Sequence, residues 1–96
     1  MKVPNKVKIL GIEYHVELQE VPMDSGQFVW GYTDYAQTKI VLCSTLSEEK
    51  RVQTLFHELV HVMLHEVGND DQCNDESLVN PLGNVLYQVL KDNELA

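Results

Sequence analysis

The sequence predicts an α+β fold, in which a small antiparallel β-sheet packs on one long helix and a second helix follows at the C-terminus. Two observations carry this prediction. The first part of the chain alternates apolar and polar side chains with a period of two, as half-buried strands do. From about residue 45 onward, apolar side chains recur every three or four residues, as on one face of a helix. With 96 residues, 44% of them hydrophobic, residues 1–96 are expected to form one small domain.

Four strands are expected before the first helix. Residues 7–10 and 14–18 form a hairpin, and residues 28–32 and 38–43 give two further strands rich in β-branched and aromatic side chains. The segment 21–26 between these pairs is rich in turn-forming residues and is predicted to be a surface loop. The simplest arrangement of the four strands is an antiparallel meander.

The long helix begins at Thr45 or at Ser47, because either side chain can cap the first turn. It is expected to end at about Val67, where Gly68 supplies a stop signal. Its apolar stripe consists of Val52, Leu55, Phe56, Leu59, Val60, Met63 and Val67.

The last helix is expected to follow a polar, acidic loop at residues 69–74. Asn74 or Asp75 can cap this helix, and its apolar repeat continues until it ends near Asn93. Pro81 falls inside the span, which predicts a kink or a short first turn, since proline removes a hydrogen bond from a helix interior.

The long helix contains the pattern H-E-x-x-H at residues 57–61. His57 and His61 are four residues apart, so their imidazoles leave the same face of the helix and can bind one divalent ion. Glu58 lies about 100° further round the helix, from where its carboxylate can reach a water on the metal without being a ligand. The pattern therefore predicts two metal ligands and a general base for hydrolysis.

Two other histidines, His65 and His15, are less suited to bind the metal. His65 follows His61 with the same spacing of four, but Val62 then stands where the base is needed. We therefore expect His65 to face solvent or to support the ligands. His15 lies on the polar face of a predicted strand and is expected to be solvated.

A catalytic zinc usually has three protein ligands and one open position, so a third ligand must come from elsewhere in the chain. The possible donors after the long helix are Asp70, Asp71, Cys73, Asp75 and Glu76. Glu76 is favoured because it lies in the first turn of a helix that can cross the metal-binding helix.

Charge and composition exclude several classes of function. The formal net charge of −8 argues against electrostatic binding to nucleic acid or to an anionic membrane. No run of residues approaches the length of a membrane span, and the first residues lack the apolar core of a signal peptide, so a cytoplasmic location is expected. Cys43 and Cys73 are then expected to be free thiols.

Residues 39–90 resemble the minimal peptidase domain of the ImmA/IrrE-type metallopeptidases of bacteria, their phages and mobile elements. The stretch 54–61 (TLFHELVH) is similar to the T-L-x-H-E-L-x-H helix of that family. The stretch 76–80 (ESLVN) is similar to its E-x-x-A-N segment, with Val79 in place of the usual alanine and Pro81 directly after it. The resemblance implies a zincin-like fold and a zinc cofactor in a phage or mobile-element protein.

The same resemblance implies a role for each matching residue. His57 and His61 correspond to metal ligands, Glu58 to the general base and Glu76 to the third zinc ligand. Asn80 corresponds to the asparagine of the second segment and would support the ligands.

The resulting hypothesis is a gluzincin-like zinc endopeptidase that hydrolyses peptide bonds of one specific intracellular protein. Tyr32, Tyr35 or Tyr87 could donate a hydrogen bond to the oxyanion, and an edge strand would pair with an extended substrate. The alternative is a non-enzymatic module in which zinc staples a small domain and the acidic surface binds a host or phage protein. An intact Glu58 favours the enzyme, because a structural zinc site needs no base.

Overall fold

The computed structural model describes residues 1–95 and has the predicted α+β fold. Its N-terminal half forms a four-stranded sheet with the order β1-β2-β6-β5. The strands are β1 (Lys6–Ile9), β2 (Ile12–Gln19), β5 (Gly31–Asp34) and β6 (Lys39–Cys43). The hairpin expected near the N-terminus is present, since β1 and β2 pair antiparallel.

The predicted antiparallel meander is wrong for one strand pair, because β2 and β6 are parallel, with Val16 opposite Ile40. β6 lies inside the sheet, between β2 and the edge strand β5. The composition of β6 explains this position. Its apolar residues 40–43 are completely buried, as expected for a strand covered on both faces, whereas β5 carries the more polar sequence Gly-Tyr-Thr-Asp and lies at the edge.

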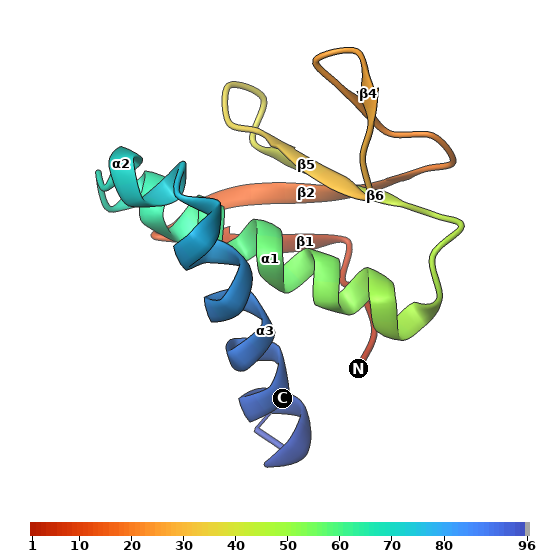
Figure 1. Cartoon of the computed structure of the whole chain (residues 1–96), viewed down its shortest axis with the longest axis vertical. Coiled ribbons are helices and arrows are strands. Elements are labelled where there is room, and N and C mark those ends of the chain that lie inside the picture. Colours follow the sequence, from red (N-terminus) through yellow and green to blue (C-terminus); the bar gives the residue numbers. More distant parts are fainter. Residues whose placement is uncertain (96) are drawn as a thin grey trace.

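The segment predicted to be a loop at residues 21–26 instead belongs to a short hairpin. It consists of β3 (Met23–Asp24) and β4 (Gln27–Phe28), which pair with each other and not with the main sheet. In Figure 1 this hairpin stands above one end of the sheet, and the chain then returns into β5. The third strand of the sheet therefore begins at Gly31, later than the sequence pattern indicates.

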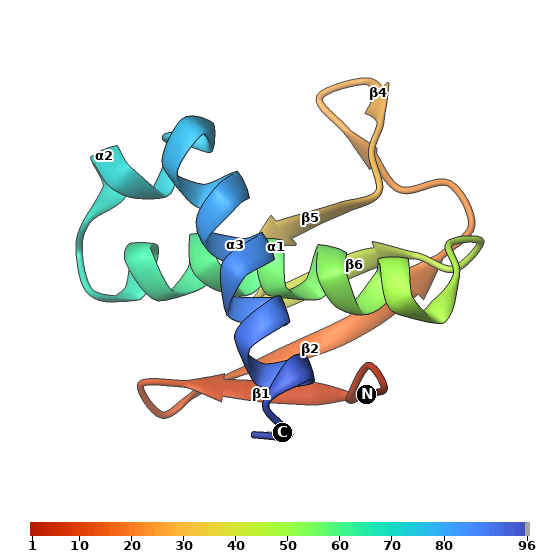
Figure 2. The same cartoon turned by 60° about the horizontal axis from the view of Figure 1, so that its bottom comes forward.

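The long helix is α1 (Glu48–Glu66), and Ser47 caps it by accepting a hydrogen bond from the backbone amide of Lys50 at 3.2 Å. α1 runs across one face of the sheet, and α3 (Glu76–Asp92) crosses α1 on the other side (Figure 1). Figure 2 shows this crossing from a second direction, with α3 in front of α1. The H-E-x-x-H pattern therefore lies on a helix that is covered from two sides.

Coverage from two sides changes the predicted apolar stripe of α1. Met63 and Val67 are exposed (38% and 58%), whereas Val62 and Glu58 are buried (0% and 7%). Val62 belongs to the main apolar cluster of the core. The predicted stripe missed Val62 and Glu58, because a helix packed against both a sheet and a second helix buries a wider arc.

The loop predicted at residues 69–74 contains a one-turn helix, α2 (Asp70–Cys73). Cys73 anchors this turn in the core, where its thiol donates to the carbonyl of His61 at 3.1 Å. α3 is capped by Asp75 and continues as one helix through Pro81. Cys43 and Cys73 are free thiols. Among residues 1–95, no helix is both long enough and apolar enough to cross a membrane.

Candidate metal centre

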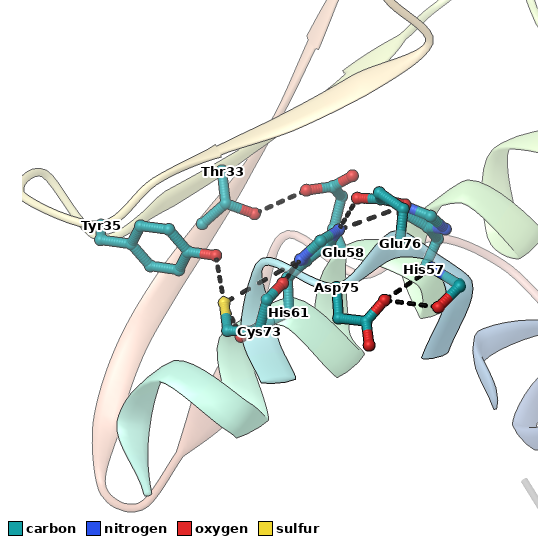
Figure 3. Close-up of polar contacts among 9 residues, drawn as sticks. Thr33, Tyr35, His57, Glu58, His61, Cys73, Asp75 and Glu76 are labelled. Carbon is teal, nitrogen blue, oxygen red and sulfur yellow. Dashed lines mark hydrogen bonds and ion pairs between the residues drawn. The ribbon is translucent and has the colours of Figure 1, made fainter. Parts of the chain in front are cut away.

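Three side chains from two helices converge at one point. His57 and His61 project from α1, and Glu76 projects from the first turn of α3 (Figure 3). The two Nε2 atoms are 3.3 Å apart, and the carboxylate oxygens of Glu76 lie 3.2 Å from His57 Nε2 and 2.7 Å from His61 Nε2. All three ligand atoms lie within 4.8 Å of one another.

The orientation of His61 is set by the turn that α2 forms. Its Nδ1 lies 2.6 Å from the backbone carbonyl oxygen of Cys73. A carbonyl only accepts, so Nδ1 carries the proton and the lone pair of Nε2 faces Glu76 and His57. A hydrogen bond of this kind on the far nitrogen is the usual support for a metal-binding histidine.

The convergent group fits a divalent metal ion. Zinc binds nitrogen and oxygen at roughly 2.0–2.2 Å with tetrahedral angles, so its ligand atoms stand about 3.3 Å apart. The separations of 3.3 Å between the histidines and 3.2 Å from His57 to Glu76 match this value. The separation of 2.7 Å between His61 Nε2 and the Glu76 carboxylate is shorter than this value, and Glu76, with 62% of its side chain exposed, has room to widen it. Two imidazoles and one carboxylate are also a donor set of catalytic zinc sites.

Glu58 lies beside this group but is held from the opposite side. It is 7% exposed, and the hydroxyl of Thr33 on the edge strand β5 donates to its Oε1 at 2.9 Å (Figure 3). Burial raises the pKa of Glu58 above its usual range, and the hydrogen bond from Thr33 and the nearby His61 and His57 partly oppose this rise. A buried carboxylate with a raised pKa is a suitable proton acceptor.

The other donors considered for the third ligand have different contacts. Asp75 caps α3 through the backbone amide of Ser77 at 3.1 Å, and Asp70 lies 3.0 Å from His65. The thiol of Cys73 faces the carbonyl of His61 and the hydroxyl of Tyr35. Asp71 is exposed on α2. Among residues 1–95, only His57, His61 and Glu76 form a group that could hold a metal ion.

His65 and the three tyrosines lie away from the convergent group or are engaged elsewhere. Tyr35 stacks on His65 with ring centroids 4.1 Å apart, and its hydroxyl lies 3.3 Å from the thiol of Cys73. Tyr87 packs on Phe56. Tyr32 alternates with Thr33 along β5, so it points to the other face of the sheet. His15 is exposed and lies 3.4 Å from a carboxylate oxygen of Glu13.

A cleft of about 560 Å³ opens next to the convergent group. It is bounded by the start of β5, by the N-terminal half of α1 and by one side of α3, and His57 and Glu58 form its inner end. Asn80 and Asn84 of α3 contribute side-chain amides to its wall. The cleft leads from solvent to the buried carboxylate that is the candidate base.

Three features of the site were not identified from the sequence. Thr33 belongs to no sequence motif, because its contact with Glu58 forms only when β5 packs on α1. Cys73 contacts His61 through its backbone carbonyl, which every residue has, so the residue type does not indicate this contact. Gly83 carried a usable signal, since a glycine inside an apolar helix often marks close packing. A Cβ at Gly83 would lie 3.0 Å from the Cα of His57, so only glycine lets α3 approach α1 this closely.

A histidine pair on one helix, with a carboxylate ligand from a following helix, is the site architecture of H-E-x-x-H metallopeptidases. The sequence profile of the IrrE N-terminal-like domain family, Peptidase M78, matches residues 12–79, which is more than half of the chain. The chain therefore belongs to this peptidase family. Comparisons with curated proteins and with solved structures found no match.

Proposed function

We propose that this chain is a zinc-dependent endopeptidase in which His57, His61 and Glu76 hold the metal and Glu58 is the general base. The observation that carries the proposal is the position of Glu58, which is buried, held by Thr33 and placed at the inner end of an open cleft. A structural zinc site has no use for such a carboxylate, because it needs ligands only.

A zinc ion held by these residues would act as a Lewis acid that polarises the peptide carbonyl and acidifies a bound water. Glu58 takes the proton of the attacking water on its carboxylate and passes it to the nitrogen of the leaving amine. Thr33 keeps Oε1 in place, so that the second oxygen is oriented for this transfer. The carbonyl of Cys73 keeps the lone pair of His61 Nε2 turned toward the metal position.

The edge strand β5 gives the substrate a place to bind. One edge of β5 pairs with β6, and among residues 1–95 its other edge has no partner strand in the sheet. Thr33 of β5 contacts the candidate base Glu58. An extended peptide that pairs with the other side of β5 therefore lies along the cleft beside Glu58. The strand β5 then positions both the substrate and the side chain of Glu58.

The partner of this domain is proposed to be one dedicated cytoplasmic protein and not unfolded chains in general. A domain of this size provides few side-chain pockets, so docking of a folded partner must contribute to recognition. The net charge of −8 favours a partner with a basic surface. We expect little turnover of casein, and rapid digestion of casein at many sites by the zinc-loaded protein contradicts this specificity.

The metal assignment is tested by elemental analysis of the purified chain. We expect close to one zinc per chain, and either His57→Ala or His61→Ala should lower both zinc content and melting temperature. His15→Ala is the matched control, because His15 is exposed on β2 and outside the metal-binding group. Full zinc retention by the double variant of His57 and His61 excludes the assignment.

The catalytic assignment is tested by Glu58→Gln, which keeps the shape of the side chain but removes the base. We expect full zinc content and a fall in hydrolysis by a factor of about 100 to 10,000. If the wild-type chain binds zinc and a protein partner but cleaves no partner, the alternative of a zinc-stapled binding module is correct instead.

A further inference from the structure

Two half-exposed aromatic side chains line the cleft that leads to Glu58. Phe28 at the end of β4 is 52% exposed, and Trp30 just before β5 is 50% exposed. Every other aromatic residue of the chain is buried or only partly exposed. Exposed aromatic surface gathered in a concave site is typical of ligand-binding surfaces, since its burial by a ligand is favourable.

The aromatic wall is fixed to the rest of the fold by backbone contacts. The carbonyl of Trp30 accepts a hydrogen bond from the amide of Cys43 at 2.8 Å, and the amide of Val29 donates to the carbonyl of Pro22 at 3.0 Å. Gly31 follows directly, and a Cβ there would lie 2.8 Å from the side chain of Thr54 on α1. This wall is therefore held against α1 before any substrate binds, which lowers the entropic cost of binding.

The charge in the cleft differs from that of the molecule as a whole. The only carboxylate in its lining is Glu58, at the inner end, although the chain carries a net charge of −8. Lys50 contributes an ammonium group that lies 5.3 Å from the centre of the Trp30 ring and 3.0 Å from the amide oxygen of Gln53. The outer part of the cleft is thus aromatic and cationic.

We propose that this cleft selects the substrate side chain beside the scissile bond, and that it accepts a large apolar or aromatic side chain. Phe28 and Trp30 provide the surface against which that side chain is buried, and Lys50 disfavours lysine or arginine at the same position. The inference rests on the proposed peptidase function, which supplies the scissile bond. Recognition then has two steps. The acidic exterior binds a partner with a basic surface, and the cleft binds an apolar side chain within that partner.

The test uses the only tryptophan of the chain as a reporter, since Trp30 lies in the cleft itself. The full-length, zinc-loaded chain carrying Glu58→Gln is titrated with the blocked peptides acetyl-Gly-Gly-X-Gly-Gly-amide, where X is Phe, Ala or Lys, and the fluorescence is recorded. We expect saturable binding of the Phe peptide that is at least about tenfold tighter than that of the Ala peptide, given what burial of such a side chain contributes. The Lys peptide should bind no better than the Ala peptide.

Matched variants locate the preference. Phe28→Ala should reduce the preference for Phe over Ala several-fold, whereas Val85→Ala, which truncates an exposed residue outside the cleft lining, should leave it unchanged. Lys50→Gln should improve binding of the Lys peptide, and Lys91→Gln, which removes the same charge far along α3, should not. Equal affinities for Phe and Ala, or an unchanged preference in Phe28→Ala, overturn the proposal.

A second measurement separates this inference from the proposed function. The zinc-loaded wild-type chain is incubated with a mixture of proteome-derived peptides, and the cleavage sites are read by mass spectrometry. Enrichment of large apolar residues beside the cut supports both proposals, and cuts without such enrichment overturn the cleft specificity alone. Selective binding of the Phe peptide without any cleavage supports the cleft and overturns the peptidase function.

Discussion

The site has a sheet side and a helix side that hold their carboxylates in different ways. On the sheet side, Glu58 is 7% exposed and receives a hydrogen bond from Thr33 of β5. On the helix side, 62% of the Glu76 side chain is exposed, and its position depends on how α3 crosses α1. His57 and His61 contact Glu76 directly and lie close enough to Glu58 to oppose part of the rise that burial causes in its pKa.

This difference separates the proposed roles of the two carboxylates. A metal ligand can remain flexible and exposed until the ion orders it, because the ion supplies the energy that fixes its position. A proton acceptor has no such help and must be held by the protein, at the cost of burying a charge. Glu76 therefore has the environment of a ligand, and Glu58 has the environment of a base.

The largest expected effect comes from exchanging each carboxylate for its neutral amide. Glu58→Gln should lower hydrolysis by a factor of about 100 to 10,000. It should keep or raise the melting temperature of the metal-free chain, because a buried ionised carboxylate is removed. Glu76→Gln should leave the metal-free melting temperature unchanged but lower zinc content and the stabilisation that zinc gives. Differential scanning fluorimetry with and without zinc measures both.

The reversed pattern contradicts the distinction between the two sides. If Glu58→Gln loses zinc while Glu76→Gln keeps it, the assigned roles are exchanged. Glu13→Gln on β2 serves as a control for removal of a carboxylate outside the site, and it should change neither zinc content nor hydrolysis.

The next largest effect should come from Gly83→Ala, which acts on the helix side only. The new Cβ would lie 3.0 Å from the Cα and 3.3 Å from the backbone nitrogen of His57, so α3 must move away from α1. We expect a loss of about 1–3 kcal/mol in the free energy of unfolding and weaker zinc binding, because Glu76 moves with α3. Urea unfolding and zinc titration measure the two effects.

Val85→Ala on the exposed side of α3 is the control for Gly83→Ala, and it should change stability little. Zinc binding at wild-type strength in Gly83→Ala, together with a loss of stability, would show that Glu76 does not depend on the close crossing of α1 and α3.

The elements of this fold could largely be predicted from the sequence, because periodicity and caps are local signals. The strands around residues 7–18 and 38–43, the helix cap at Ser47 and the cap at Asp75 all follow from residues close in sequence. The order of the strands did not follow in this way. Whether β6 pairs parallel or antiparallel with β2 depends on which strand is buried on both faces, and this is decided by the whole fold.

The helix side of the site was also easier to predict than the sheet side. His57 and His61 are one turn apart on one helix, and the resemblance to a peptidase family pointed to Glu76. The contact between Thr33 and Glu58 joins residues 25 positions apart through the packing of β5 on α1, and no spacing in the sequence marks it.

A smaller effect is expected from Thr33→Val, which acts on the sheet side. Valine keeps the shape but removes the hydroxyl that donates to Glu58, so the base loses its support. We expect a loss of about 1–2 kcal/mol in the free energy of unfolding and a fall in kcat of roughly tenfold, with KM little changed and zinc retained. Thr33→Ser should restore most of kcat, since it keeps the donor. Equal kcat values for the valine and serine variants would show that the hydroxyl does not position Glu58.

The smallest effect tests whether the sheet side also holds the far end of α1. Tyr14 on β2 is completely buried, and its hydroxyl donates to Glu66 in the last turn of α1 at 2.5 Å. Tyr14→Phe removes this bond and should lower the free energy of unfolding at pH 7 by about 1 kcal/mol. Urea unfolding of the variant and the wild type at pH 7 measures the difference.

The contribution of Tyr14 should disappear in alkaline solution, and the sign follows from its pKa. Burial, followed by the hydrogen bond to Glu66, raises the pKa of Tyr14 above its ordinary value near 10. Above about pH 10 the unfolded chain loses this proton while the folded chain keeps it, so the contribution is complete below pH 10 and is lost as pH rises toward the folded-state pKa. Tyr14→Phe should therefore lose stability less steeply than the wild type between pH 9 and 11. Parallel stability curves over this range would show that the hydroxyl of Tyr14 is not held in the fold.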